Sequence, residues 1–400
     1  MKKYYATFLL NETNISFKML EETEELYATV WQKQIDLTPN NFKNVETLIE
    51  ETQNYLYSKL NKKKKDEYRV YYSMIISDML AKKNRVSLKQ NKYEYVLVDN
   101  VANDKILKKI NSAKPENWNP NDAILKAQTF LYELDNSLGE TKRYAEFPKD
   151  RNGLELRAYK SYLCCPKDTL VVKILDIFKA KKITFNKILL ETQSICAEKN
   201  DDKVKLMVNF TWSHLTSIAS INNNAYLLNS YLLDEKKFKK GLKDFNDSFA
   251  MMQIKISALL KSWKYFSSLQ HNTEDAKIFK YMQNVVDNSI QKLYNDNKQL
   301  GLDFSNLTVI LSGENCDFFT HRWKTLYPNV KIVVIDQSEA KMNNLPLSFL
   351  GSTLILSNFE LKNHNLGNTI DTVPTNKNKI VSFFKKIFPI KKPNMQNNLS

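Results

Sequence analysis

The order of strand-like and helix-like patterns is the feature of this sequence that most restricts its fold. The chain begins with an apolar run, Tyr4–Leu10, a polar turn and a second apolar run, Ile15–Leu20, which together have the pattern of a β-hairpin. Much later, two further strand-like runs, Leu215–Ile221 and Ala225–Leu232, surround three consecutive asparagines. Helical patterns stand between and after these hairpins, so we expect an α/β chain. Its 400 residues favour two or more subdomains.

The remaining elements are assigned from residue spacing, because apolar residues recur about every 3.6 positions in helices and every second position in strands. We expect further strands at Tyr27–Ile35, Tyr68–Ile76, Lys205–Phe210, Leu307–Leu311 and Val330–Ile335. We expect helices at Phe42–Leu60, Leu170–Phe178, Phe185–Ala197, Phe238–Phe245, Phe249–Phe266, Glu274–Gln299, from the Ser312-Gly313-Glu314 turn to Tyr327, and at Phe349–Leu356.

The segment Ser87–Thr169 is more polar than its surroundings and is expected to form a small inserted α+β unit. It contains apolar stretches at Tyr93–Val98 and Leu154–Leu163. Pro120 suits the first turn of a helix, so a helix is predicted near Pro120–Leu131. Near the end of the chain, Glu360–Asn378 is rich in Asn and Thr without periodicity, which is typical of a linker.

Charge and cysteine usage restrict the partners and the compartment. The net charge of +15 favours anionic partners, either nucleic acid or lipid headgroups. No nucleic-acid module signature is present, so no nucleic-acid partner is expected. No apolar run reaches the ~18 residues that cross a bilayer, and the first apolar run lacks the features of a secretory signal, so we expect a cytoplasmic protein. The four cysteines and four histidines show no metal-ligand spacing, and no metal is expected.

The segment that follows the linker has the pattern of a short basic amphipathic helix. On a helical wheel its bulky apolar residues share one arc, Lys385 and Lys386 lie on the other, and Pro389 ends the helix. Such a helix suits the headgroup boundary of an anionic membrane. The residues expected to bind the membrane are Ile380, Val381, Phe383, Phe384, Lys385, Lys386, Ile387 and Phe388.

Three turns carry a resemblance to a known family. The first is Leu9-Leu10-Asn11-Glu12-Thr13, the second is Asn209-Phe210-Thr211-Trp212-Ser213, and the third is the apolar strand before Ser312-Gly313-Glu314. Together with the order of elements and the tail, these turns make the chain resemble FtsA, a bacterial division protein of the actin-like ATPase superfamily. The resemblance implies an actin-like two-domain fold with ribonuclease-H-like halves and an inserted small α+β subdomain.

The resemblance also implies where the family would hold ATP, and here the turns depart from its pattern. The family has Asp, an apolar residue and Gly-Thr-Thr in the first phosphate loop; here Leu9 stands at the Asp place and Asn11 at the Gly place. In the second loop Asn209 replaces the Asp, and no glycine remains. Glycines let backbone N–H groups approach phosphate, and a carboxylate holds the magnesium ion or its waters. The residues left for a vestigial nucleotide cleft are Thr13, Ser213, Ser312 and Gly313.

The turns therefore argue against ATP hydrolysis, leave at most weakly bound ATP on the Ser312-Gly313 side, and assign no catalytic residue. The resemblance implies a membrane tether and scaffold for the tubulin-like division protein FtsZ, bound through the second large domain, with self-association into filaments, at the inner face of the cell membrane. It implies these limits: the first actin-like domain at 1–86, 170–204 and 336–359; the inserted subdomain at 87–169; the second domain at 205–335; a linker at 360–378; and the membrane helix at 379–392.

Three other functions stay open at this point. A nucleotide-dependent actin-like ATPase that forms filaments would have the same order of elements. The pilus-assembly relative PilM shares the fold and the insertion, although the resemblance to PilM implies no amphipathic tail. A basic nucleic-acid-binding protein is suggested only by the net charge.

Overall fold

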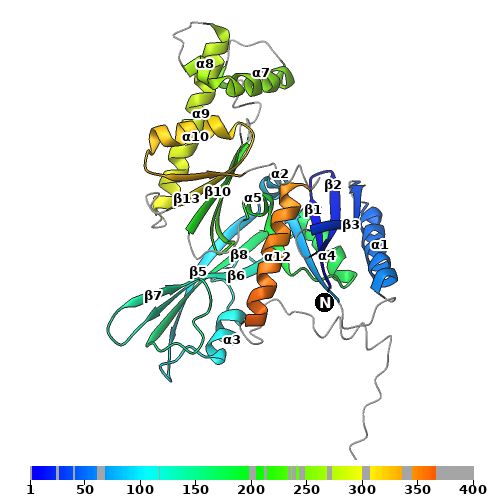
Figure 1. The fold of residues 1–400 in the computed structure, drawn as a ribbon, viewed down its shortest axis with the longest axis vertical. Helices are drawn as coiled ribbons and strands as arrows, with labels where there is room; N and C mark the ends of the chain where they lie inside the picture. Colours follow the sequence, from blue (N-terminus) through cyan, green and yellow to red (C-terminus); the bar gives the residue numbers. More distant parts are fainter. Residues whose placement is uncertain are drawn as a thin grey trace, which may run out of the picture.

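The computed structural model describes residues 2–23, 27–38, 41–60, 68–116, 118–197, 204–210, 214–232, 236, 240–242, 248–267, 273–299, 307–335 and 345–365. Three β-sheets organise these residues (Figure 1). Among them no helix is long and apolar enough to cross a membrane. The predicted linker beyond Asn365, the whole amphipathic tail, and most of the predicted helix Phe238–Phe245 lie outside the described residues.

The first five-stranded sheet has the order β3-β2-β1-β4-β9. Its strands are β1 (Lys2–Leu10), β2 (Asn14–Glu22), β3 (Tyr27–Asp36), β4 (Tyr68–Ile76) and β9 (Lys187–Leu190). The first three strands form an antiparallel meander, and β4 and β9 run parallel to β1. The predicted hairpin and the strand Tyr68–Ile76 are thus confirmed.

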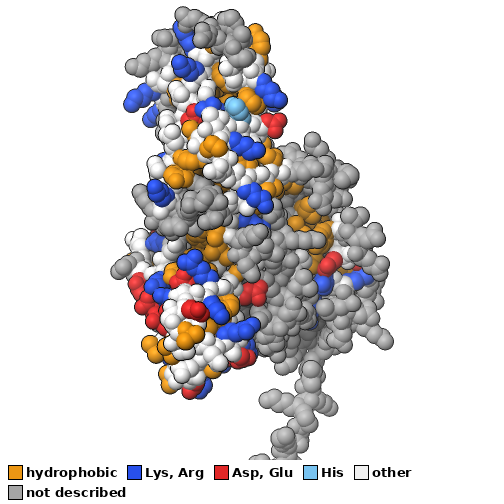
Figure 2. Space-filling view, turned by 60° about the vertical axis from the view of Figure 1, so that its left-hand side comes forward, with side chains coloured by type: hydrophobic (Ala, Val, Ile, Leu, Met, Phe, Trp, Pro, Cys, Tyr) orange, Lys and Arg blue, Asp and Glu red, His pale blue; other side chains and the backbone are white. Residues whose placement is uncertain are grey.

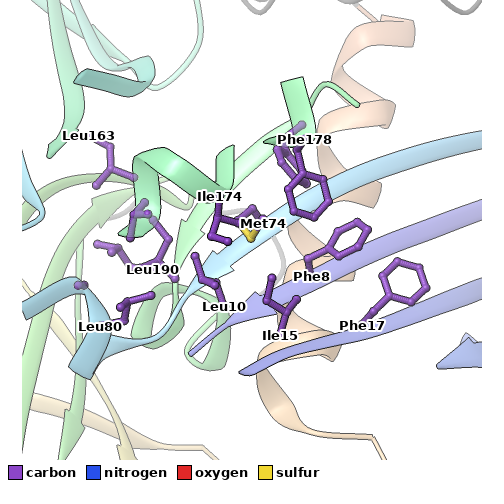
Figure 3. Close-up of a cluster of buried hydrophobic side chains, with 14 of the residues drawn as sticks. Phe8, Leu10, Ile15, Phe17, Met74, Leu80, Leu163, Ile174, Phe178 and Leu190 are labelled. Carbon is purple, nitrogen blue, oxygen red and sulfur yellow. The ribbon is translucent and has the colours of Figure 1, made fainter. Parts of the chain in front are cut away.

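Alternate residues of β1 face two different helical layers, because successive side chains of a strand point to opposite faces. Phe8 and Leu10 join a large apolar cluster with Ile174 and Phe178 of α4 (Leu170–Ala180) (Figure 3), to which α1 (Lys43–Leu60) also contributes. Tyr5 and Leu9 pack on the other face with α12 (Leu347–Asn365). The first sheet is therefore covered on both faces.

The second five-stranded sheet repeats the same plan with the order β12-β11-β10-β13-β14. Its strands are β10 (Val204–Phe210), β11 (His214–Ile221), β12 (Asn224–Leu232), β13 (Thr308–Gly313) and β14 (Lys331–Val334). Again the first three are antiparallel and the last two run parallel to the first. The asparagine turn of the predicted hairpin is confirmed: Asn222 and Asn223 both have positive φ, as the tight hairpin turn requires.

One face of the second sheet packs on its own helices. These are α7 (Phe249–Lys261), α8 (Trp263–Ser267), α9 (Glu274–Gln299) and α10 (Cys316–Leu326). Their aromatic residues Phe318, Phe319 and Trp323 are fully buried in this second apolar cluster. The opposite face of the sheet turns toward the first half of the chain, because Met207, Ile310 and their neighbours belong to the first apolar cluster.

The third sheet is formed by the polar insertion and has the order β5-β8-β6-β7. Its strands are β5 (Ser87–Val96), β6 (Asp122–Asp135), β7 (Thr141–Tyr144) and β8 (Glu155–Pro166), and α3 (Asp104–Ser112) packs against it. The buried Lys160 ammonium donates to three carbonyl oxygens at the end of α3, those of Ile110, Asn111 and Ala113. An α+β insertion is thus confirmed as a structural unit, while its limits as a domain stay a prediction.

Three element predictions were wrong. The predicted helix Pro120–Leu131 is the strand β6, because this segment pairs along its length with β8 and tertiary pairing overrides the helix-start signal of Pro120. The predicted helix Phe185–Ala197 is split into the short strand β9 and the five-residue helix α5 (Glu191–Ile195). The predicted linker begins too early, because α12 continues to Asn365.

Candidate functional site

The four residues predicted for a vestigial cleft are only partly brought together. Ser312 and Gly313 end strand β13, next to the end of β10. Thr13 lies in the β1–β2 turn of the first sheet, where its exposed hydroxyl accepts a hydrogen bond from the Asn14 side chain at 3.4 Å. Ser213 lies outside the described residues.

Polar groups of the first turn form hydrogen bonds with one another. The backbone N–H of Asn11 donates to the carbonyl of Asn14 at 2.9 Å, and the two side chains are hydrogen-bonded as well. The Glu12 carboxylate pairs with the Lys83 ammonium at the end of α2 (Asp78–Lys83). Leu9, at the place of the family's carboxylate, packs partly buried against the apolar residues beneath α12. The turn thus presents a carboxylate and an apolar side chain where a phosphate would need donors.

The Asn209 carboxamide stands at the place of the second carboxylate in the FtsA pattern. Both its NH₂ group and its carbonyl oxygen form hydrogen bonds. Its Nδ2 donates to Oδ2 of Asp78 at 3.1 Å, and its Oδ1 accepts from the Ser312 hydroxyl at 3.2 Å. Asp78, only 3% exposed, also accepts from the hydroxyl and the backbone N–H of Thr192, at 2.6 and 3.2 Å. Asn209 and Ser312 belong to the second sheet, whereas Asp78 and Thr192 follow β4 and β9 of the first. We call these four residues the seam.

Gly313 serves the packing of the strands. Its φ is +101°, and a Cβ atom there would lie 2.2 Å from the carbonyl oxygen of Phe210. The next residue, Glu314, donates its backbone N–H to that same carbonyl at 2.8 Å. Glycine is therefore required for the close approach of the ends of β10 and β13.

Two carboxyl groups at the seam were not predicted from the sequence. Glu191 begins α5, and its Oε2 accepts from the backbone N–H of Asp78 at 3.1 Å. Burial, and then the nearby Asp78 carboxylate, raise the pKa of Glu191 to about 7. A usable signal was present: Asp78 and Glu191 each follow closely on a parallel strand, and adjacent parallel strands end at the same edge of a sheet. The sequence hides this signal, because the residues of β9 and α5 together have the spacing of one helix.

His214 begins β11 at the same edge and is 6% exposed. Its Nε2 hydrogen-bonds the Thr216 hydroxyl at 2.7 Å. Burial lowers the pKa of His214, the Asp78 carboxylate opposes this shift, and Lys82 adds to it. A buried imidazole with a short bond to a hydroxyl on its own strand acts as a structural hydrogen-bonding group. Across the described residues, no cluster of three or more His, Cys, Asp or Glu side chains suited to a metal ion is found.

The seam lies where two sheets of identical plan meet. In each sheet a central strand, β1 or β10, begins an antiparallel meander and is continued by two parallel strands on its other side. Two ribonuclease-H-like sheets of this kind, facing one another and joined through α5, define the architecture. The chain has an actin-like fold.

Comparisons with known proteins gave structural matches only. No protein-family model matches the sequence, and no curated protein sequence matches it. Among solved structures, a PilM–PilN type IV pilus biogenesis complex aligns over 88% of this chain and 98% of that chain, at 10% identity and a TM-score of 0.46.

Two further structures show the range of the similarity. A Bacteroides thetaiotaomicron protein with an actin-like ATPase fold and unknown function aligns over 88% of this chain and 95% of that chain, at 10% identity and a TM-score of 0.33. An Alp12 filament subunit aligns over 89% of this chain and 99% of that chain, at 8% identity and a TM-score of 0.36. At such identities and TM-scores, these similarities do not bear on function.

The chemistry available at this actin-like seam is that of a closed hydrogen-bond network. The NH₂ group and the carbonyl oxygen of Asn209 and both carboxylate oxygens of Asp78 form hydrogen bonds with neighbouring residues of the chain. A magnesium-nucleotide site would instead need a carboxylate facing the metal and backbone donors facing the phosphates. The residues at the seam are suited to hold the two halves together.

Proposed function

We propose that this protein is an FtsA-like membrane tether and scaffold for an FtsZ-like division protein, peripheral on the inner face of the cell membrane, in which the nucleotide cleft has become a structural contact. The observation that carries the structural-contact part of the proposal is the Asn209 carboxamide, which occupies the position of the family's second carboxylate and bridges the two halves directly. With Asn209 and the first turn engaged in contacts within the chain, the amphipathic tail is the functional part of the family pattern that the sequence retains.

The same observation weighs against the nucleotide-dependent ATPase. An ATPase cycle would have to break the seam contacts to admit a nucleotide and its metal. The tail distinguishes the tether from a PilM-like assembly scaffold, because the resemblance to PilM implies no such segment. Self-association into filaments, which the resemblance implies, would strengthen membrane binding by presenting several tails on one polymer.

Membrane binding is tested with paired substitutions in the tail. Phe384→Asp removes a bulky side chain from the apolar arc and adds one negative charge, whereas Ser382→Asp adds the same charge to the polar arc. Burial of a Phe contributes roughly 1.5–3 kcal/mol and each charge near an anionic surface about 1 kcal/mol. We expect Phe384→Asp to lower the fraction pelleted with phosphatidylglycerol vesicles far more than Ser382→Asp.

A variant that ends at Asn376 provides the limiting case and is expected to stay in the supernatant. Equal pelleting of this variant and the full-length protein would contradict the tether. Equal losses from Phe384→Asp and Ser382→Asp would show that charge, and not insertion of an apolar face, attaches the protein.

A candidate partner surface lies on the helices at the top of Figure 1. Met251 and Ile254 of α7 are 58% and 67% exposed, and Tyr265 of α8 is 62% exposed. Met251 and Ile254 are three residues apart and therefore share one face of the helix. In the view of Figure 2 this upper part also carries many Lys and Arg side chains. An apolar strip among basic residues suits an acidic, partly apolar peptide such as a filament tail.

The partner surface is tested with Ile254→Asp, which places a charge on the exposed apolar face of α7. We expect at least a tenfold loss of affinity for the C-terminal tail peptide of the FtsZ from the same organism, measured by fluorescence anisotropy, because burial of an Ile contributes roughly 1.5–3 kcal/mol. Asn284→Asp, an exposed position on α9, makes the same change of charge outside the strip and serves as the control. Unchanged binding by Ile254→Asp would place the partner elsewhere.

A further inference from the structure

The contact between the two halves is continuous and has an apolar and a polar part. Met207, Ile218 and Ile310, on β10, β11 and β13 of the second sheet, are fully buried in the same apolar cluster as Phe8 and Phe178 of the first half. Toward the ends of these strands, the same face of the second sheet becomes polar, with Asn209, Thr216 and Ser312. These polar groups therefore lie at the edge where an actin-like protein would hold its ligand.

Hydrogen bonds cross from one half to the other at three separate places. Asn209 donates to Asp78, as described above. The Gln193 carboxamide on α5 donates to the backbone carbonyl of Asn223 in the second hairpin at 2.6 Å. The Lys82 ammonium on α2 donates to the backbone carbonyl of Ser230 at 3.1 Å.

The inserted sheet adds a second connection away from the seam. Its Gln128 and Ser161 side chains donate to the carbonyl of Ala225 in β12 at 2.8 and 2.7 Å, and Phe130 stacks on Tyr226 with ring centroids 4.5 Å apart. The same sheet reaches the first half through the Lys126 ammonium, which donates to the carbonyl of Asn186 at 2.9 Å. The insertion therefore contacts both halves at once.

Asparagine is the residue that makes the seam independent of a ligand. Its NH₂ group faces a carboxylate and its carbonyl faces a hydroxyl, so both contacts are favourable without a cation. An aspartate at the same place would set two carboxylates about 3 Å apart inside the protein, where like charges repel strongly and a cation or a proton is needed. Whether residue 209 carries an amide NH₂ or a second carboxylate oxygen thus decides whether the contact between the halves needs a cation or a proton.

We propose that Asn209 is a ligand-independent bridge that holds the two halves of this protein in one fixed relative orientation. A body of this kind holds the helices α7 and α8 in a constant position relative to the first half, with no nucleotide cycle. The bridge follows from the contacts of the core alone. It can therefore fail while the proposed tether holds, or hold while the tether fails, because hydrogen exchange in the core and vesicle pelleting are separate measurements.

The test is hydrogen–deuterium exchange of the full-length protein, read from peptides that cover α5 and β13. Asn209→Asp keeps the shape of the side chain but replaces the NH₂ group that donates to Asp78 with a carboxylate oxygen. We expect at least tenfold faster exchange in both peptides. Asn119→Asp makes the same change at an exposed residue, where the side-chain oxygen accepts from the Asn121 N–H as a carboxylate also can, and should exchange like the wild type.

The double variant Asp78→Asn/Asn209→Asp exchanges the donor and the acceptor and restores one amide–carboxylate pair. It is expected to return exchange in both peptides to within threefold of the wild type, even if Asn209→Asp alone fails to fold. Addition of MgATP to the wild type should leave exchange unchanged. Wild-type exchange in Asn209→Asp, failure of the double variant to recover, or slower wild-type exchange with MgATP would each overturn the proposal.

Discussion

Replacing Gly351 with alanine is expected to destabilise the protein by at least about 2–3 kcal/mol, at the upper end of overpacking effects. A Cβ atom at this position in α12 would lie 1.7 Å from the carbonyl oxygen of Ser194 in α5 and 3.1 Å from the Cβ of Ala197. The first contact is with backbone, which no change of side-chain rotamer can relieve. The helix α12 would have to move away from α5, which connects the two halves.

The displacement would have a second cost in the layer beneath α12. The Ser352 hydroxyl lies 2.7 Å from that of Ser73, which in turn lies 2.9 Å from that of Thr7, all fully buried. A shift of about 1 Å would stretch such bonds beyond useful geometry and leave buried hydroxyls unpaired.

The sign of the effect makes the prediction decisive, because helix propensity works in the opposite direction. Gly to Ala inside a helix gains about 1 kcal/mol when nothing else changes. Urea unfolding of Gly351→Ala should therefore show a lower midpoint with an unchanged slope. Circular dichroism before unfolding serves as the control that the helix content is retained. A higher midpoint would mean that the close approach of α12 to α5 does not exist in solution.

The strands of the two five-stranded sheets were largely predictable because their signals are local. Tyr4–Leu10 and Ile15–Leu20 are apolar runs around a polar turn, and Asn222–Asn224 supplies the asparagines that tolerate positive φ. The short strand β9 was not predictable in this way. It has four residues, pairs among the described strands with β4 alone, and continues at once into α5, so its apolar residues have a helical spacing in the sequence.

The candidate site was harder to predict because it depends on contacts between distant parts of the chain. Asp78 and Thr192 are separated by 114 positions, and Asp78 and Asn209 by 131. The departure of Asn209 from the family pattern was visible in the sequence, but its partner was not. Loss of a ligand-binding residue can be read from a motif, whereas what replaces the ligand depends on tertiary structure.

Replacing Glu191 with glutamine is expected to stabilise the protein increasingly as the pH rises from about 5 to 8. The pKa of Glu191 is raised to about 7 in the folded protein, against an ordinary value of 4.5, by burial and by the Asp78 carboxylate. Between these values the folded state holds a proton that the unfolded state releases, so the wild type loses stability as the pH rises through this window and changes little above it. Glutamine cannot ionise, and its carbonyl oxygen can still accept from the Asp78 N–H.

The size of the effect follows from the raised pKa. Each pKa unit corresponds to about 1.4 kcal/mol, so the stability difference between Glu191→Gln and the wild type should be about 2 kcal/mol larger at pH 8 than at pH 5. Urea unfolding at the two pH values measures this difference directly. Glu116→Gln removes the same kind of group from an exposed turn and should change the stability by less than about 0.5 kcal/mol at either pH. If Glu191→Gln and the wild type lose stability in parallel over this range, the Glu191 carboxyl is solvated and the seam is open at its edge.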